Sequence, residues 1–264
     1  MTTLPRSAFS VLTLNLRFGL ADDGRHAWVQ RRGALGAFLE TRNCDVMMFQ
    51  EANDFQIDFL STCLRDYDVI GKRSPAPDFW QNNVIFYRAP LKLDTWRHFY
   101  LSPTPDIPSR FAHSRWPRQC TLGRFRTGPH EVVCGTTHLD FAESVQVASA
   151  AIIIEGIGQM AGERPVILGG DFNCTPTSAC HAVFTRSSKP SDNATRDGRF
   201  RNVLKAPFPG TFHGFEGGAG HQCIDWILYR GAVSAHQGQV IHYPATACYP
   251  SDHYPVTANF VVGS

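Results

Sequence analysis

Short apolar runs, rich in β-branched and aromatic residues and bounded by polar, Gly or Pro clusters, constrain the fold of this sequence most. Such runs are typical of buried strands. Eight of them predict strands at 9–16, 45–50, 83–87, 120–126, 131–138, 165–169, 223–229 and 255–262. Apolar residues at helical spacing predict helices over 26–42, 54–65 and 143–160. Many strands with few helices indicate two β-sheets packed face to face with the helices outside them.

Length and composition agree with one large core. A chain of 264 residues fits a single domain spanning 1–264, since α/β and two-sheet domains of about 250 residues are common. Hydrophobic residues at 43% and charged residues at 18% exclude wholesale disorder. The formal net charge of +2 gives no whole-surface field that favours nucleic acid, although a phosphate site needs only local positive charge.

The cysteines and the apolar stretches bear on location. The eight cysteines include no C-x-x-C pair and lack zinc-ligand spacing. No apolar stretch approaches the roughly 20 residues that a membrane span needs, and the N-terminal segment lacks a signal-peptide core. We therefore expect a cytoplasmic protein with reduced cysteines and no stable membrane insertion. The sequence gives no evidence of a protein partner.

Polar residues that can take part in catalysis or metal binding recur beside the predicted strands. Strand ends at one edge of a layered fold converge on a single pocket, so these side chains predict one site. They are Asn15, Glu51, His138, Asp171, Asn173, Asp225, Asp252 and His253. Each has a simpler explanation when taken alone, such as a helix N-cap for Glu51 or an Asx turn for Asp171.

In this order the motifs resemble the endonuclease/exonuclease/phosphatase superfamily, which has the DNase I-like fold. The matching segments are LNLR (14–17), FQE (49–51), TTHLD (136–140), GGDFN (169–173), IDWIL (224–228) and SDHYPV (251–256). A W-x-x-R segment at 28–31 and GTFHGF at 210–215 are similar to small bacterial members. The resemblance implies a four-layer α/β sandwich of two mostly antiparallel sheets flanked by helices. It also implies divalent-metal-dependent cleavage of phosphoester bonds.

The resemblance assigns roles around a metal ion and a water molecule. Glu51 is the expected ligand of Mg²⁺ or Mn²⁺, and Asn15 and Asp252 complete or orient that site. Mg²⁺ takes one or two carboxylates together with water and substrate oxygens, which suits a single strand-end Glu. Asp171 is expected to orient or deprotonate the attacking water, and Asn173 to donate its amide to a phosphate oxygen.

Two histidines receive catalytic roles from the same resemblance. His253 is expected to bind the scissile phosphate as an imidazolium, kept protonated by Asp225, so activity should fall at high pH. His138 resembles a residue that protonates the leaving oxygen. Its usual carboxylate partner corresponds by spacing to Gln81, which cannot stabilise an imidazolium in the same way. His138 is therefore either a general acid, a hydrogen-bond donor to phosphate or a structural histidine.

Four further residues are candidates for substrate binding. Arg118 resembles a phosphate-contacting arginine, although a solvated surface arginine fits the sequence equally well. Trp116 and Trp80 lie in predicted loops and could stack on a base or ring at the rim of the site, or be scattered surface aromatics. His213, in GTFHGF, could line the pocket or be structural.

These residues predict a phosphodiesterase that hydrolyses its substrate by in-line attack of an Asp-activated water. The substrate is a phosphoester, whether a small molecule, a lipid headgroup or a nucleic acid. One alternative is a DNA or RNA nuclease, which the arginine-rich segment 196–201 favours and the near-neutral charge opposes. The other is a catalytically inactive protein that binds a phosphorylated ligand.

Overall fold

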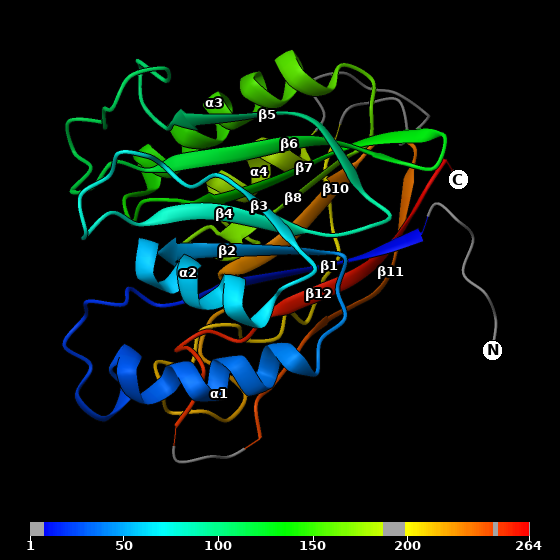
Figure 1. Ribbon diagram of the computed structural model, residues 1–264. Coiled ribbons are helices and arrows are strands. Elements are labelled where there is room, and N and C mark those ends of the chain that lie inside the picture. Colours follow the sequence, from blue (N-terminus) through cyan, green and yellow to red (C-terminus); the bar gives the residue numbers. More distant parts are fainter. Residues whose placement is uncertain (1–7, 187–198, 245–247, 264) are drawn as a thin grey trace.

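The computed structural model describes residues 8–186, 199–244 and 248–263. These residues form two six-stranded sheets packed face to face, which confirms the predicted sandwich (Figure 1). The first sheet has the order β11 (Val233–Val240), β12 (Val256–Val262), β1 (Ala8–Asn15), β2 (Val46–Ala52), β4 (Asn82–Tyr87) and β3 (Asp68–Ile70). The second has the order β5 (Lys92–Tyr100), β6 (Gln119–Thr127), β7 (His130–His138), β8 (Val166–Asp171), β10 (Asp225–Arg230) and β9 (Arg201–Asn202). The arginine-rich segment 196–201 lies partly outside the described residues.

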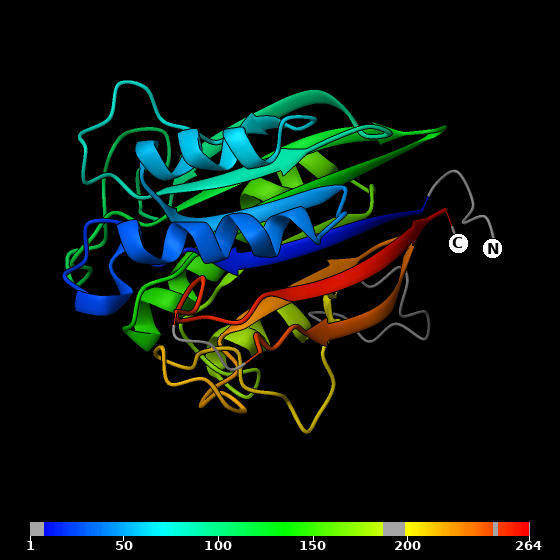
Figure 2. The same cartoon turned by 60° about the horizontal axis from the view of Figure 1, so that its bottom comes forward.

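Helices cover the outer faces of the two sheets. The helical elements are η1 (Gly24–His26), α1 (Trp28–Glu40), α2 (Asp54–Cys63), α3 (Glu143–Ala161) and α4 (Ala179–Thr185). Helices α1 and α2 lie beside each other on the first sheet (Figure 2), and α3 contacts β6 and β7 of the second. The layers therefore run helix, sheet, sheet, helix, as expected for the four-layer sandwich.

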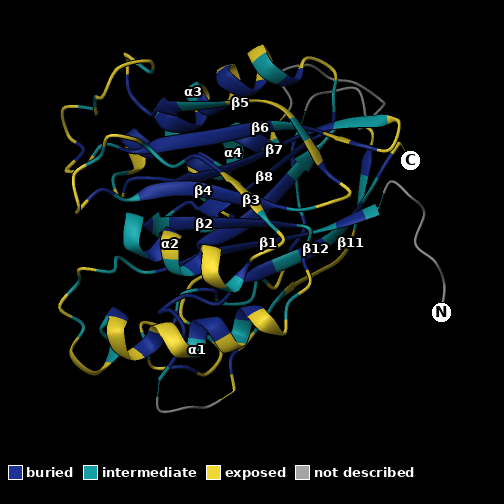
Figure 3. Ribbon diagram, in the orientation of Figure 1, coloured by how far each residue is buried: buried dark blue, intermediate teal, exposed yellow. Residues whose placement is uncertain are grey.

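Alternating side chains of β1 show why the central strands read as continuous apolar runs. Val11 belongs to the core between the sheets, whereas Leu12 and Leu14 belong to the core beneath α1 and α2. Both faces of the strand are buried, so no polar alternation appears in the sequence. Figure 3 shows the same division, with buried central strands and exposed outer faces on α1 and α2.

Parallel pairing at the centre of each sheet places the strand ends that matter for function. The pairs β1–β2 and β7–β8 are parallel, and the other described pairs are antiparallel. Parallel strands end at the same edge, so Asn15 lies opposite Gln50 and His138 lies opposite Asp171. Asp225, at the start of antiparallel β10, also pairs with Asp171. One edge of the sandwich thus collects the predicted site residues.

Helix α3 has the length and mean hydropathy of a membrane span, although Ser149 and Glu155 interrupt its apolar run. Its face carrying Ala150, Ile153 and Ile157 is buried in the core between helix and sheet, while Ile154 at the border of this face is 36% exposed. The high hydropathy of this helix is therefore accounted for by packing against the second sheet.

Gly170 provides a test of how closely β7 and β8 approach beneath the site. A Cβ at this position would lie 2.1 Å from the carbonyl oxygen of Thr137, which is backbone of the neighbouring strand and cannot rotate away. We expect Gly170→Ala to lower the free energy of unfolding by about 3 kcal/mol, measured by urea denaturation. Gly158→Ala is the control, because an added Cβ there meets nothing within 4 Å on the exposed side of α3. It should leave stability unchanged or raise it slightly.

Candidate active site

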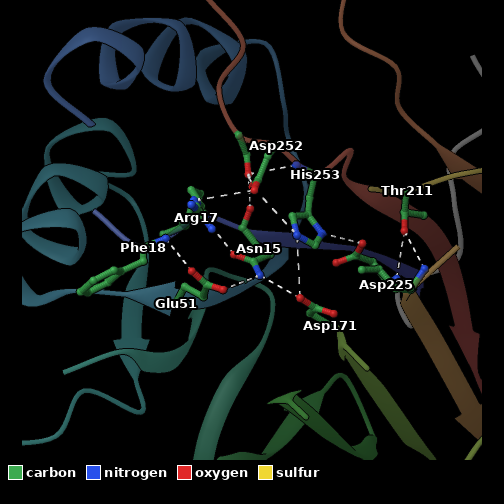
Figure 4. Close-up of polar contacts among 12 residues, drawn as sticks. Asn15, Arg17, Phe18, Glu51, Asp171, Thr211, Asp225, Asp252 and His253 are labelled. Carbon is green, nitrogen blue, oxygen red and sulfur yellow. Dashed lines mark hydrogen bonds and ion pairs between the residues drawn. The ribbon is translucent and has the colours of Figure 1, made fainter. Parts of the chain in front are cut away.

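The amide of Asn15 joins carboxylates from the two sheets. Its Nδ2 donates to Glu51 Oε1 at 3.2 Å and to Asp171 Oδ2 at 2.9 Å. Its Oδ1 accepts the backbone N–H of Arg17 at 2.8 Å, which fixes the orientation of the amide. Figure 4 shows these side chains around one small space, with Asp252 and His253 beside them. The predicted Glu51, Asn15 and Asp171 are thus brought together, with the nitrogen of Asn15 rather than its oxygen facing the acids.

Three residues around this space have a left-handed backbone that is uncommon outside glycine. Arg17, Glu51 and Asn173 have φ values of 61°, 59° and 51°. Such conformations cost free energy and persist where the surroundings hold them, most often at functional sites. The backbone N–H of Phe18 donates to Glu51 Oε2 at 2.5 Å and holds that carboxylate from the other side.

His253 and Asp225 form a buried ion pair. His253 Nδ1 lies 2.9 Å from Asp225 Oδ2, and both side chains are almost fully buried. Burial alone lowers the pKa of His253, but the charges of Asp225 and Asp252 and the hydrogen bond to Asp225 outweigh it and raise the pKa to about 10. His253 is therefore an imidazolium at neutral pH, with Nε2 3.9 Å from Asp171 Oδ2.

The buried carboxylate of Asp171 has too little positive charge around it to keep its pKa at the usual value. Burial and then the charge of Asp225 raise its pKa to about 7, against the opposing effects of His253 and of the Asn15 hydrogen bond. The backbone N–H of Asn173 donates to Oδ1 at 2.9 Å and orients the group. A buried acid with a pKa near neutrality is suited to accept a proton from water.

His138 lies closest to hydrogen-bond donors, with Asp171 Oδ2 and Glu51 Oε1 farther from its Nε2, at 3.5 and 3.8 Å. Arg118 Nη1 is 3.0 Å from Nδ1 and 3.2 Å from Nε2 of this histidine, and the amide nitrogen of Asn173 is 3.0 Å from Nε2. Burial and the charges of Arg118 and His253 hold the pKa of His138 well below its usual range. A low pKa favours the neutral imidazole and opposes the general-acid role, which stays a prediction. Gln81 is connected to His138 only through Gln119. The carbonyl oxygen of Gln81 accepts a hydrogen bond from the Gln119 side chain, and Gln119 lies opposite His138 in the sheet.

Asn173 is engaged differently from the role expected for it. Its amide nitrogen contacts His138 Nε2 and donates to the carbonyl oxygen of Leu139 at 2.9 Å. Both amide hydrogens are therefore directed at protein groups. Donation to a phosphate oxygen would require Asn173 to give up one of them, and that role stays a prediction.

The donor set fits a hard divalent cation. Asp225 is balanced by His253, whereas Glu51 and Asp171 share one neutral amide. Oxygen ligands that include one or two carboxylates are those that Mg²⁺ and Mn²⁺ take. Asp171, Asp225 and His253 also place possible ligand atoms within 4.8 Å of one another. Because the imidazolium of His253 already donates to Asp225, Glu51 offers a better position for the cation.

The chain is similar to a known protein family over most of its length. A family model of the endonuclease/exonuclease/phosphatase family matches residues 12–253. The chain belongs to this family. A family member from Bacteroides vulgatus has a similar structure, with a TM-score of 0.85 and 24% sequence identity over 97% of this chain and 99% of that one. No curated protein matches the chain.

Two further solved structures share the fold. A mannosyl-6-phosphatase from Bacteroides thetaiotaomicron has a TM-score of 0.79 and 24% identity, over 96% of this chain and 99% of that one. Truncated TDP2 from Caenorhabditis elegans has a TM-score of 0.70 and 17% identity, over 97% and 98% of the two chains. Identities this low establish the fold, and membership of the family makes the chain a relative of phosphoester hydrolases.

Arg118 contacts His138 at the candidate site and is buried, 7% exposed, so the alternative of a solvated surface arginine is wrong. Its Nε is 4.0 Å from Asp140 Oδ2. Ser114 links the same Asp140 carboxylate to the backbone carbonyl of Trp116. Trp116 is 49% exposed, and its position next to this chain of contacts agrees with a place on the rim.

Trp80 and His213 are not brought to the rim. Trp80 is 8% exposed, with Arg73 over one ring face at 4.3 Å and Tyr100 against it edge-on, so the surface needed for stacking on a substrate is covered. His213 is fully buried and stacks on Tyr254 at 4.1 Å. Its backbone N–H donates to the carbonyl oxygen of Asp252 at 2.9 Å. We conclude that His213 supports the loop of the family's SDH motif from behind.

Arg31 supports the same loop and was singled out from the sequence only as part of W-x-x-R. Its guanidinium is fully buried and donates to three carbonyl oxygens, at 2.6 Å to Leu16, 3.0 Å to Pro250 and 2.8 Å to Arg17. These carbonyls belong to the segments that follow Asn15 and precede Asp252. Burial lowers the pKa of Arg31 to about 10, so it stays charged at neutral pH. Only the spacing from Trp28 could have suggested this role.

The contacts of Arg31 predict a large effect of its removal. Arg31→Met should lower the free energy of unfolding by at least about 3 kcal/mol, because it removes three charged hydrogen bonds and leaves the carbonyl oxygens of Leu16 and Pro250 without this donor. Urea denaturation measures this loss. The neighbouring Arg32 is exposed on the same helix, and Arg32→Met should change stability by less than about 0.5 kcal/mol. Similar losses for the two variants would contradict the role given to Arg31.

Proposed function

We propose that the chain is a metal-dependent phosphodiesterase that hydrolyses its substrate by in-line attack of a water activated by Asp171. One observation carries this proposal. The Asn15 amide holds Glu51 and Asp171 together, beside the imidazolium of His253. A phosphoester needs a cation, a base and a group that stabilises negative charge, and these residues supply places for all three.

Glu51 would hold Mg²⁺ or Mn²⁺, with Asp252 and Asn15 completing or orienting its surroundings. A bound cation would polarise a phosphate oxygen and offset the negative charge of the substrate. Arg17 pairs with Asp23 at 2.7 Å and lies 3.8 Å from Asp252 Oδ2, so Asp252 is shared between this arginine and the site. The remaining chemistry belongs to the side chains themselves.

Asp171 and His253 divide the proton chemistry and the charge stabilisation. Asp171 accepts the proton of the attacking water, since its pKa near 7 matches that task. His253 carries its positive charge toward the phosphate, and Asp225 fixes the ring through Nδ1. Neutral His138 has one acceptor nitrogen, which can take a hydrogen bond from Arg118 or from Asn173, so Arg118 is the cation on that side of the site. We assign phosphate contact to Arg118 and a positioning role to His138.

The function is tested by assaying bis-p-nitrophenyl phosphate with Mg²⁺, with Mn²⁺ and after chelation. Asp171→Asn should lower kcat by at least about a hundredfold, because general-base catalysis is worth roughly 10² to 10⁴. Asp58→Asn is the matched control, since the Asp58 side chain, on α2, is 73% exposed and pairs with Lys72. It should keep full activity.

The outcomes separate the alternatives. No metal-stimulated turnover by a folded protein would contradict the phosphodiesterase and favour a binding protein for phosphorylated ligands. Cleavage of DNA or RNA that weakens steeply with salt would favour a nuclease. Full activity of Asp171→Asn would remove this residue from the mechanism. Release of phosphate from monoesters alone would replace diesters with monoesters as substrates.

The pKa of His253 predicts where activity is lost at high pH. The group must be protonated to act, so kcat should fall as pH rises through about 10 rather than through neutrality. Asp225→Asn removes the charge that holds the proton, and the alkaline limb should move down by about one pH unit or more. A pH–rate profile of the two proteins measures this shift. An unchanged alkaline limb in Asp225→Asn would show that His253 is not the titrating group.

A further inference from the structure

We propose that Phe141 forms a stacking platform for a planar ring carried by the phosphoester substrate. The inference rests on the proposed function, because it places the phosphate next to Arg118. It goes beyond that function by naming the substrate class, which is a phosphoester whose substituent ends in a flat ring such as a nucleobase.

Phe141 is an apolar side chain that folding alone leaves unburied. It is 74% exposed, more than any other large hydrophobic residue that the structure describes. The backbone around it is held in a turn, because Asp140 Oδ1 accepts the backbone N–H of Ala142 at 3.1 Å. An exposed aromatic ring on such a turn is typical of binding surfaces rather than of cores.

The ring is continuous with the phosphate side of the site. The guanidinium carbon of Arg118 lies 5.6 Å from the centre of the Phe141 ring, and Nη1 of the same arginine lies 3.0 Å from His138. Arg118 therefore has the reacting end of the site on one side and Phe141 on the other. A substituent that is attached to the phosphate and extends toward this side would lie against the Phe141 ring.

Trp116 supplies a second exposed ring on a loop that is linked to the Phe141 loop. Ser114 Oγ contacts both the Trp116 carbonyl and the Asp140 carboxylate, so the two loops are tied together at this point. The guanidinium carbon of Arg115 lies 5.2 Å from the Trp116 ring centre. Each exposed ring is thus accompanied by an arginine, Phe141 by Arg118 and Trp116 by Arg115.

Aromatic faces next to guanidinium groups favour flat, polarisable ligands. A planar ring stacks on an aromatic face and on a guanidinium plane, whereas an alkyl chain gains little from the charges. A lipid surface would need a contiguous apolar patch, but here each exposed ring has a guanidinium group over it, Arg115 over Trp116 and Arg118 over Phe141. Loss of one base-stacking aromatic costs about five- to a hundredfold in affinity.

Calorimetric titration with AMP and with ribose 5-phosphate, both with Mg²⁺, tests the platform. The two probes share the phosphate and the ribose and differ only in adenine. The wild-type protein should bind AMP at least about fivefold more tightly. Phe141→Ala should bring the ratio of the two Kd values close to one, and Phe141→Trp should keep it. Because the ratio is compared, any change at Arg118 affects both probes and cancels.

Trp96→Ala is the matched control, since Trp96 is a 44% exposed aromatic on edge strand β5 and should leave the ratio unchanged. A ratio near one in the wild type, or no binding of either probe, would overturn the platform. A preserved ratio in Phe141→Ala would overturn it as well. So would octyl phosphate if it bound more tightly than methyl phosphate by the same factor as AMP over ribose 5-phosphate. Loss of the proposed function is seen separately. Absence of bis-p-nitrophenyl phosphate turnover with an intact AMP preference would refute hydrolysis and leave the platform standing.

Discussion

The hydrogen bonds from the Asn15 amide to Glu51 and Asp171 set the position of the whole site, because they join one acid from each sheet. Two like charges at such short range repel unless a donor or a cation lies between them. Hydrogen bonds beneath the site also join the two sheets. Gln50 Nε2 donates to Thr13 of the first sheet at 3.0 Å and to Thr136 of the second sheet at 2.8 Å.

The charges of the site follow from this arrangement. Asp225 lies beside Asp171 in the ladder of β8 and β10, and this proximity raises the pKa of Asp171 while it also keeps His253 protonated. The buried carboxylate of Asp225 thus helps to raise the pKa of Asp171 to about 7 and that of His253 to about 10. His138, equally buried but beside Arg118, is driven in the opposite direction. Two histidines in one pocket acquire different charges because their nearest neighbours differ in sign.

The sequence allowed the prediction of eight strands, and these are the eight interior strands of the two sheets. The strands it did not reveal are β3, β5, β9 and β11, which are the four edges. An edge strand such as β11 has one unpaired side and mostly exposed side chains, so it lacks the apolar run by which a strand is recognised. Short α4, of seven residues, likewise carries too little periodicity to be identified. The layers could thus be predicted because burial on two faces leaves a pattern in the sequence.

The site shows the same limit in another form. The strand ends indicated Glu51 and Asp171, because the end of a parallel strand is also the edge where a pocket forms. His253 was indicated because it precedes antiparallel β12, which begins at the same edge. The strand ends could not give the partners, since Asn173 contacts His138 across 35 positions and Asn15 contacts Asp171 across 156. Exposure was equally out of reach. Trp80 and Phe141 are both aromatic residues near loops, and only the neighbours that fold against them bury the first and leave the second in water. A residue type at a strand end indicates chemistry, and the tertiary contacts decide its protonation and its access to substrate.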